Sequence, residues 1–252
     1  MDGFVSRART LGGLLGTWVK IASAEVLELL GYAGFDFVVI DLEHASIAPD
    51  DAYRMVLVAQ AAGMSALVRL PDHTGSAIQP LLDAGADGLL VPRASDPAEA
   101  DAITRRMVFA PRGERGLGFT SRAGKWGLSD IGAYLSRGDE QCVRMIQLED
   151  RGALERAADF AALEHVNGLF VGHGDLFLST GKPSTDPEIV ALTRQMLDAT
   201  KRAEKLSGVA AGTPEDACSY LDMGFSLVMV SNDCTMLGKA AADLVSRARR
   251  TG

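Results

Sequence analysis

The segment Phe37–His44, with the sequence FVVIDLEH, decides the fold. Four apolar, β-favouring residues lead directly into Asp41, Glu43 and His44. A short apolar run of this kind is typical of a strand that is buried on both faces, as in a parallel sheet. Three titratable groups at the end of such a strand cost stability unless they are paired or functional. We therefore expect a polar site where this strand leaves the core.

Similar apolar runs recur along the chain and alternate with segments of helical pattern. The other expected strands cover residues 14–19, 66–69, 88–92, 143–148, 166–171, 209–212 and 227–230. Eight strands that alternate with helices predict a parallel sheet, and eight such units at this length close as a (β/α)8 TIM barrel. An open doubly wound sheet is the alternative, but it usually carries a glycine fingerprint after its first strand. Here Gly12 and Gly13 precede that strand.

The alternation runs through the whole chain, so we expect residues 1–252 to form a single barrel domain. It is interrupted at about residues 109–141, a glycine-rich stretch too long for a routine connection. Long loops are usually functional or linkers. This one carries Arg112, Arg115, Arg122 and Trp126, which favours an active-site or interface loop over a linker.

The composition excludes several classes of protein. The 252 residues carry a net charge of −8, so nucleic-acid binding through a broad basic surface is not expected. No apolar run approaches the length of a transmembrane helix, and the first residues lack the apolar core of a signal peptide. The three cysteines are widely spaced and indicate neither a disulfide framework nor a zinc site. We expect a cytoplasmic protein without a membrane partner.

Candidate functional residues follow from the fold, because the active site of such a barrel lies at the carboxyl ends of its strands. His44 suits a general base at neutral pH, and a structural histidine hydrogen-bonded near Asp41 is the alternative. Arg69 ends an apolar strand and needs an anionic partner. That partner is either a substrate carboxylate or one of the carboxylates of Asp41 and Glu43.

Two further carboxylates follow neighbouring strands. Glu149 ends the fifth strand, and Asp175 comes shortly after the sixth, so their side chains can converge. Two carboxylates together with water and substrate oxygens suit a hard divalent ion such as Mg²⁺ or Mn²⁺. A solvated glutamate and a helix-capping aspartate are the alternative.

At these residues the sequence resembles a known enzyme family, the metal-dependent class II pyruvate aldolases that include 4-hydroxy-2-oxoheptanedioate aldolase and 2-keto-3-deoxy sugar-acid aldolases. The resemblance covers nearly the whole chain, and the order and spacing of four motifs make it specific. These motifs are Asp41-Leu42-Glu43-His44-Ala45, Val68-Arg69-x-Pro71, Gln147-Leu148-Glu149 and Gly172-x-x-Asp175-Leu176.

The resemblance implies a TIM barrel with a divalent metal ion, Mg²⁺, Mn²⁺ or Co²⁺, held by Glu149 and Asp175. It implies a catalytic set in which His44 is the base and Arg69 stabilises the enolate. The remaining residues that it implies are Asp41 and Asp83 in catalysis and Gln147, Gly172 and Gly174 in substrate binding. Asp83 matches an aspartate linked to the basicity of the histidine, and we expect it to act from a neighbouring subunit.

One stretch departs from the family pattern Gly-Pro-small-Asp-Leu-Ser. Here it reads Gly172-His173-Gly174-Asp175-Leu176-Phe177, so His173 replaces a proline and Phe177 replaces a small polar residue. The metal ligand is retained. The two replacements can change the rigidity of this loop and the shape of donor substrate that the site accepts.

The function that the resemblance implies is aldol chemistry. The enzyme would form and cleave 4-hydroxy-2-oxo acids through the metal-stabilised enolate of pyruvate or hydroxypyruvate and an aldehyde acceptor. A decarboxylase or a CoA-dependent lyase using the same metal–enolate chemistry is the alternative among enzymes, and a non-catalytic barrel that binds an oxo acid is the alternative outside them. The family also implies a homo-oligomer, a hexamer built as a dimer of trimers.

Overall fold

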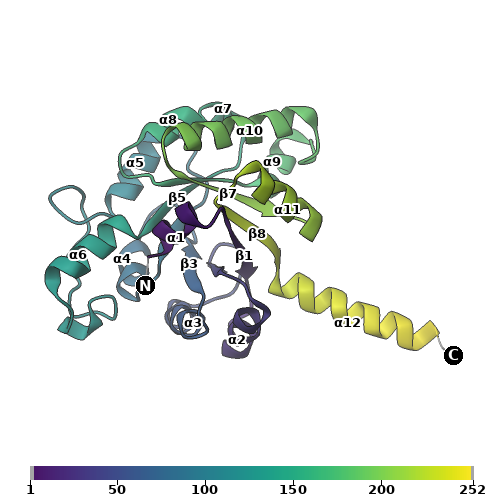
Figure 1. The fold of residues 1–252 in the computed structure, drawn as a ribbon, viewed down its shortest axis with the longest axis horizontal. Helices are drawn as coiled ribbons and strands as arrows, with labels where there is room; N and C mark the ends of the chain where they lie inside the picture. The colour runs from purple at the N-terminus through teal and green to yellow at the C-terminus, as the bar shows by residue number, and fades with distance from the viewer. Residues whose placement is uncertain (1–2, 251–252) are drawn as a thin grey trace.

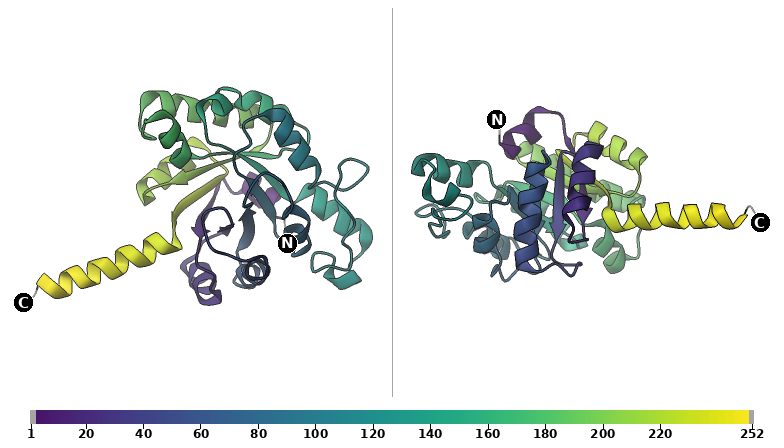
Figure 2. Two further views of the ribbon diagram at one scale, coloured as in Figure 1. Left: turned by 180° about the vertical axis from the view of Figure 1, so that it is seen from behind. Right: turned by 90° about the horizontal axis from the view of Figure 1, so that it is seen from below.

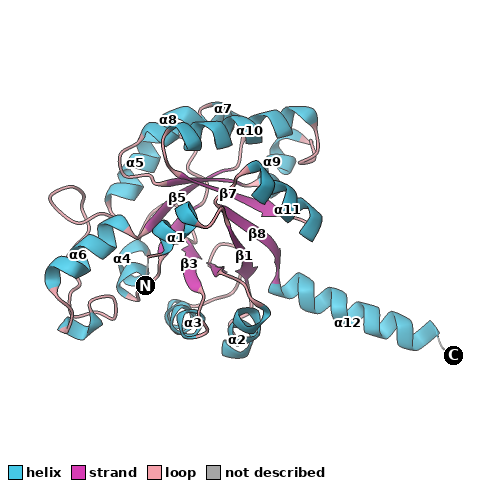
Figure 3. Cartoon of the chain, viewed as in Figure 1, coloured by secondary structure: helices cyan, strands magenta, loops and turns pink. Residues whose placement is uncertain are grey.

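A computed structural model describes residues 3–250 and shows a closed parallel barrel (Figures 1 and 3). The eight strands hydrogen-bond in sequence order, and β1 closes the ring against β8. The strands are β1 (Leu14–Val19), β2 (Phe37–Asp41), β3 (Ser65–Arg69), β4 (Gly88–Val91), β5 (Val143–Leu148), β6 (Gly168–Val171), β7 (Leu206–Ala211) and β8 (Leu227–Asn232). The predicted TIM barrel is confirmed, and the open sheet is excluded.

Helices follow the strands and surround the barrel, as the two further views in Figure 2 show. None of those within residues 3–250 is long and apolar enough to cross a membrane. They are α1 (Phe4–Thr10), α2 (Ala24–Ala33), α3 (Pro49–Ala61), α4 (Ile78–Asp83), α5 (Pro97–Arg105), the 3₁₀ turn η1 (Lys125–Gly127), α6 (Ile131–Glu140), α7 (Arg151–Glu155), α8 (Ala157–Ala162), α9 (His173–Thr180), α10 (Pro187–Arg202), α11 (Pro214–Met223) and α12 (Asp233–Arg250).

The structure differs from the expected elements in a few places. The last third of the 109–141 segment is helix α6, capped by Asp130, whose Oδ1 accepts a hydrogen bond from the Ala133 amide at 2.8 Å. Strand β7 begins at Leu206, three residues earlier than the pattern predicts. Polar Ser207 concealed this start, because in the fold it is buried and exchanges hydrogen bonds with Ser226.

The core has two layers, one inside the barrel and one between the strands and the helices. Inside, small residues make room for aromatic rings. A Cβ on Gly16 would lie only 2.4 Å from the ring of Phe37, which in turn contacts Phe4 of α1 with ring centroids 5.5 Å apart. Helix α1 therefore packs its aromatic side chain against the amino-terminal end of the barrel interior.

The last helix does not pack on the barrel from which it emerges. In Figure 1, α12 runs away from the barrel instead of lying between α11 and α2. Every residue from 237 to 249 is exposed, including Leu237, Leu244 and Val245 at one helical stripe. On the outer face of β1 and β8, Leu15 and Val230 are only partly buried. Within residues 3–250, the helix thus leaves apolar side chains exposed, and this wall of the barrel leaves Leu15 and Val230 only partly covered.

The contact between Gly16 and Phe37 predicts a stability difference between two glycine substitutions. Gly16→Ala should lower the free energy of unfolding by about 1–3 kcal/mol, because the packed interior has no room for the added methyl group. Gly212→Ala is the matched control, since its Cβ would meet nothing closer than 3.6 Å, and it should change stability by less than about 0.5 kcal/mol. Calorimetric melting temperatures of both variants check this, and equal melting temperatures would contradict the packing described.

Candidate active site

A buried ion pair joins the ends of β2 and β3. The parallel register sets Asp41 beside Arg69, and two hydrogen bonds connect them, from Nε to Oδ1 at 2.9 Å and from Nη2 to Oδ2 at 2.7 Å. Asp41 is inaccessible to solvent. Burial alone would raise the pKa of Asp41, but the hydrogen bonds and charge of Arg69, together with Lys20, outweigh it and hold that pKa well below its usual range. Asp41 is therefore a permanent anion at the mouth of the barrel.

Glu43 extends this pair into a network. Its Oε2 lies 2.9 Å from Nη1 of Arg69, and its Oε1 lies 2.8 Å from Nε of Arg93. Arg93 adopts a positive φ of 58°, a conformation uncommon for residues other than glycine. In that conformation its backbone amide donates to Oε1 of Glu149 at 2.8 Å. Arg93 thus links the Glu43 network to the carboxylate at the end of β5.

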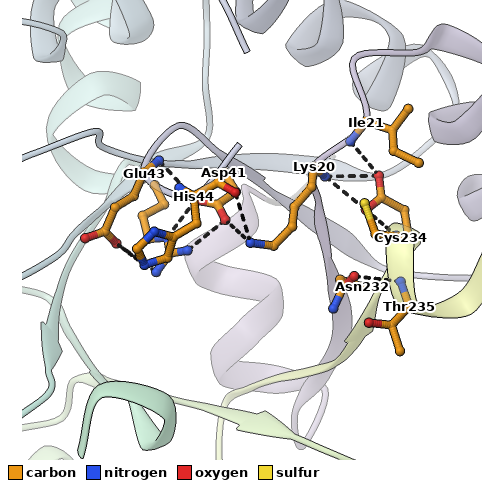
Figure 4. Close-up of polar contacts among 10 residues, drawn as sticks. Lys20, Ile21, Asp41, Glu43, His44, Asn232, Cys234 and Thr235 are labelled. Carbon is orange, nitrogen blue, oxygen red and sulfur yellow. Dashed lines mark hydrogen bonds and ion pairs between the residues drawn. The ribbon is translucent and has the colours of Figure 1, made fainter. Parts of the chain in front are cut away.

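Lys20 completes the network from the other side. It follows β1, and its Nζ lies 2.7 Å from Oδ2 of Asp41 (Figure 4). Its backbone amide is held by the carboxylate of Asp233, with N–O distances of 3.0 Å to both oxygens. Sequence reasoning named Glu43 as a possible partner of Arg69, which the contact between them confirms, but it assigned no role to Lys20 or Arg93. Both directly follow a predicted strand, which is the signal that could have identified them.

His44 lies at the open edge of the network. Its backbone amide donates to Oδ1 of Asp41 at 3.2 Å, so the turn after β2 is fixed by the same carboxylate that binds Arg69. Its ring is 46% exposed, and Nε2 lies 3.7 Å from Oε2 of Glu43, as the neighbouring side chains in Figure 4 show. The imidazole is therefore held beside the ion pairs and remains accessible to a small molecule in the mouth.

Glu149 and Asp175 converge as the sequence predicts. Glu149 is buried, and that burial, with the neighbouring carboxylates of Asp175 and Glu43, raises its pKa to about 7. Nearby, Oε1 of Gln147 is buried and has no hydrogen-bond partner among the residues that the structure describes. Two adjacent carboxylates and an unpaired amide oxygen form an oxygen donor set that suits a hard divalent cation. Within residues 3–250, no group of three or more His, Cys, Asp or Glu side chains forms a fuller protein cage.

Aromatic rings line the base of this site. The guanidinium of Arg69 lies over the ring of Trp18, 4.6 Å from its centroid, and Trp18 meets Phe170 edge to face at 5.8 Å. A guanidinium stacked on an aromatic face and held by two carboxylates keeps a fixed orientation. The backbone of Gly172 also lies close to the site, because a Cβ there would lie 3.0 Å from atoms of Gln147 and Glu149. Only glycine fits this position without displacing them.

Asp83 is not brought to the site within one chain. It ends α4, just before β4 begins, and so lies at the amino-terminal end of the barrel, opposite His44. Its carboxylate accepts a hydrogen bond from Nε2 of Gln79 at 2.8 Å and lies 3.4 Å from Nη2 of Arg115. The long segment after α5 packs here too, since Arg122 donates to the carbonyl of Ala84 at 2.8 Å.

His173 begins α9 but its ring is engaged elsewhere. Nε2 lies 3.2 Å from the hydroxyl of Thr193 on α10, and the ring stacks on Tyr220 of α11 with centroids 6.2 Å apart. Burial lowers the pKa of His173. This packing between two outer helices occupies the side chain that replaces the family's proline. Gly174 is exposed with open space around it, and Phe177 is 49% exposed.

Comparisons with known proteins identify the family of this chain. The family model described as HpcH/HpaI aldolase/citrate lyase matches residues 14–240. The chain belongs to the HpcH/HpaI family. It is 34% identical to a hydroxypyruvate/pyruvate aldolase of Chromohalobacter salexigens over 92% of both chains. It is 31% identical to a 4-hydroxy-2-oxo-heptane-1,7-dioate aldolase of Escherichia coli, covering 92% of this chain and 89% of the other.

Solved structures of the HpcH/HpaI family share the fold. A HpcH/HpaI aldolase/citrate lyase family protein from Burkholderia cenocepacia is 29% identical and superposes with a TM-score of 0.87, covering 97% of this chain and 98% of the other. The predicted resemblance is therefore confirmed over most of the chain.

The ion-pair network predicts unequal costs for its two arginines. Arg69→Met removes the main cation from two buried carboxylates and should cost about 3–5 kcal/mol of unfolding free energy. Arg93 is the matched control, because its side chain is 61% exposed and pairs with Glu43 alone. Arg93→Met should lower the free energy of unfolding by roughly 1 kcal/mol or less. Denaturant unfolding of the two variants in EDTA measures the difference, and equal losses would show that Asp41 and Glu43 do not depend on Arg69.

Proposed function

We propose that this protein is a divalent-metal-dependent aldolase that forms and cleaves 4-hydroxy-2-oxo acids from a 2-oxo acid and an aldehyde. One observation carries the proposal: a carboxylate pair, the buried Glu149 and the partly buried Asp175, shares the mouth of the barrel with an accessible histidine and a fixed arginine. This combination provides both a place for a cation and a base beside it. Membership of an aldolase family and the names of its relatives support the same chemistry.

Glu149 and Asp175 would hold the metal ion, and Mg²⁺, Mn²⁺ and Co²⁺ all suit their oxygen donors. When bound, a divalent ion supplies positive charge that stabilises the enolate of a 2-oxo acid. The side-chain amide of Gln147 and the backbone amide at Gly174 would orient the donor substrate by donating hydrogen bonds to its oxygens. The amide of Gly172 already donates to the carbonyl of Leu148 at 2.9 Å, so Gly172 contributes only by leaving space beside Gln147 and Glu149. Pyruvate and hydroxypyruvate are the donors that we propose.

His44 is the proposed base. Its exposed imidazole can take a proton from the carbon next to the keto group in the synthetic direction and from the 4-hydroxyl in cleavage. Asp41 fixes the turn that carries His44 and holds Arg69 in place. Arg69 offers a fixed positive charge to the oxygen on which negative charge develops, and such charge costs no reorganisation during the reaction.

We also propose an oligomer, most simply a hexamer built as a dimer of trimers, in which α12 packs on a second copy. The apolar stripe of α12 and the partly covered wall of β1 and β8 are complementary surfaces of one chain, so an exchange of helices between copies would bury both. Asp83 and Arg122 lie far from His44 in their own chain. In this assembly they would act across a subunit contact on the neighbouring site.

The protein would work in the cytoplasm. Cys142, Cys218 and Cys234 are all free thiols in the structure. Unpaired cysteines of which two are exposed fit a reducing compartment.

Metal removal tests the proposed chemistry. Aldol condensation of pyruvate with a panel of aldehydes should stop in EDTA and return with Mg²⁺, Mn²⁺ or Co²⁺, because the two carboxylates hold the ion with moderate strength. Glu149→Gln and Asp175→Asn should each lose both the activity and the metal-induced rise in melting temperature while remaining folded. Full turnover in EDTA would refute metal dependence.

The role of His44 predicts a separate effect on proton transfer. His44→Ala should slow deuterium exchange at the methyl group of pyruvate by roughly 10²–10⁴-fold, the usual contribution of a positioned base. Metal binding should be retained, since His44 is not among the proposed ligands. Proton NMR in D₂O measures the exchange, with His73→Ala as a control histidine on the surface. Unchanged exchange in His44→Ala would assign the base to another group.

The proposed assembly predicts a change in mass on disrupting α12. Light scattering at micromolar concentration should show a hexamer for the unmodified protein. Leu237→Glu combined with Leu244→Glu places charges in the apolar stripe and should release smaller species with lower activity, whereas the exposed Arg247→Glu should not. A monomer with full turnover would overturn the assembly and the shared site, and a stable dimer would overturn the hexamer.

A further inference from the structure

Lys20 is a charged group of the site that the proposed mechanism does not use. It lies after β1, while the carboxylate Glu149 follows β5, so the two stand on opposite sides of the eight-stranded ring. Its ammonium nevertheless reaches toward Asp41 at the mouth, as Figure 4 shows. A substrate that binds at Glu149 and Asp175 would therefore extend its far end toward Lys20.

The charges of the network leave one cation in excess. Asp41 and Glu43 supply two negative charges, and Arg69, Arg93 and Lys20 supply three positive ones. Asp41 already receives two hydrogen bonds from Arg69 and two from backbone amides, so it does not require Lys20 for its hydrogen bonding. Without Lys20 the five-residue network would become a neutral group of four. Lys20 therefore gives this five-residue network its net positive charge.

Lys20 is also better placed than Arg69 to meet a ligand. Arg69 is 7% exposed, uses three of its nitrogens on two carboxylates and lies against Trp18. The side chain of Lys20 is 26% exposed. Its Nζ has three N–H donors, and Asp41 at 2.7 Å and the more distant carbonyl of His44 at 3.5 Å use at most two of them.

We propose that Lys20 is a specificity residue that selects acceptor aldehydes bearing an anionic group, with a carboxylate as the simplest case. This inference rests on the proposed aldolase function and adds the class of acceptor. The carboxylate of the acceptor would accept a charge-assisted hydrogen bond from Lys20 while its aldehyde faces His44 and Arg69. Asp233 supports the role, because it fixes the backbone from which Lys20 reaches into the mouth.

The test compares an anionic acceptor with a neutral one of similar size. With pyruvate as donor, kcat/KM is measured for succinic semialdehyde and for butanal in the unmodified protein, Lys20→Met, Lys20→Arg and the surface control Lys201→Met. The unmodified protein and the control should prefer the anionic acceptor. A charge-assisted hydrogen bond is worth about 1.5–3 kcal/mol, so Lys20→Met should reduce that preference roughly 10- to 150-fold and Lys20→Arg should restore most of it.

The other outcomes would contradict either the role of Lys20 or the proposed aldolase function. If Lys20→Met slows both acceptors equally, Lys20 only supports Asp41 and the inference is wrong. It is equally wrong if the unmodified protein shows no preference, or if added salt weakens turnover of both acceptors alike. This salt test needs no variant, so it decides the matter even if Lys20→Met does not fold. Absence of aldol activity with every acceptor and metal would instead refute the proposed function itself.

Discussion

Two buried charges, on Asp41 and Arg69, set the arrangement of everything at the mouth of the barrel. Removing such charges from water is costly, and their attraction compensates only when their hydrogen bonds are nearly complete. Here the parallel register supplies that geometry, since it places the two residues side by side at the ends of β2 and β3. The turn carrying His44, the carboxylate of Glu43 and the ammonium of Lys20 are all oriented by contacts to this pair.

The mouth therefore contains two electrostatic regions with different tasks. On the β5 and β6 side, Glu149 and Asp175 are carboxylates that repel each other, which a divalent cation would relieve. On the β1 to β4 side, the network of Lys20, Arg69, Arg93, Asp41 and Glu43 has one more cation than carboxylates, which favours an anionic substrate. Arg93 joins the regions, because its side chain pairs with Glu43 and its amide binds Glu149. We expect a charged oxo acid to bridge these regions when a divalent ion held by Glu149 and Asp175 offsets their negative charge.

Much of the fold and part of the site followed from the sequence for physical reasons. Buried parallel strands are continuous apolar runs, so their number and order were readable, and the polar residues at their ends identified His44, Arg69, Glu149 and Asp175. The contact between Lys20 and Asp41 could not be predicted, because it depends on the direction of a long side chain and on closure of the ring. The positive φ of Arg93 accompanies contacts with Glu43 and Glu149 that are distant in sequence, and the apolar stripe of α12 does not reveal that this helix leaves the barrel.

We propose that Glu149 and Asp175 hold the metal ion on which the chemistry depends. Diffraction from crystals soaked in Mn²⁺, recorded at the manganese absorption edge, tests this assignment. We expect one strong anomalous peak within about 2.0–2.6 Å of oxygens from both carboxylates, the range of such oxygen ligands, and its loss in crystals of Asp175→Asn. A peak bound elsewhere in the barrel, or no peak at saturating Mn²⁺ in an active protein, would contradict it.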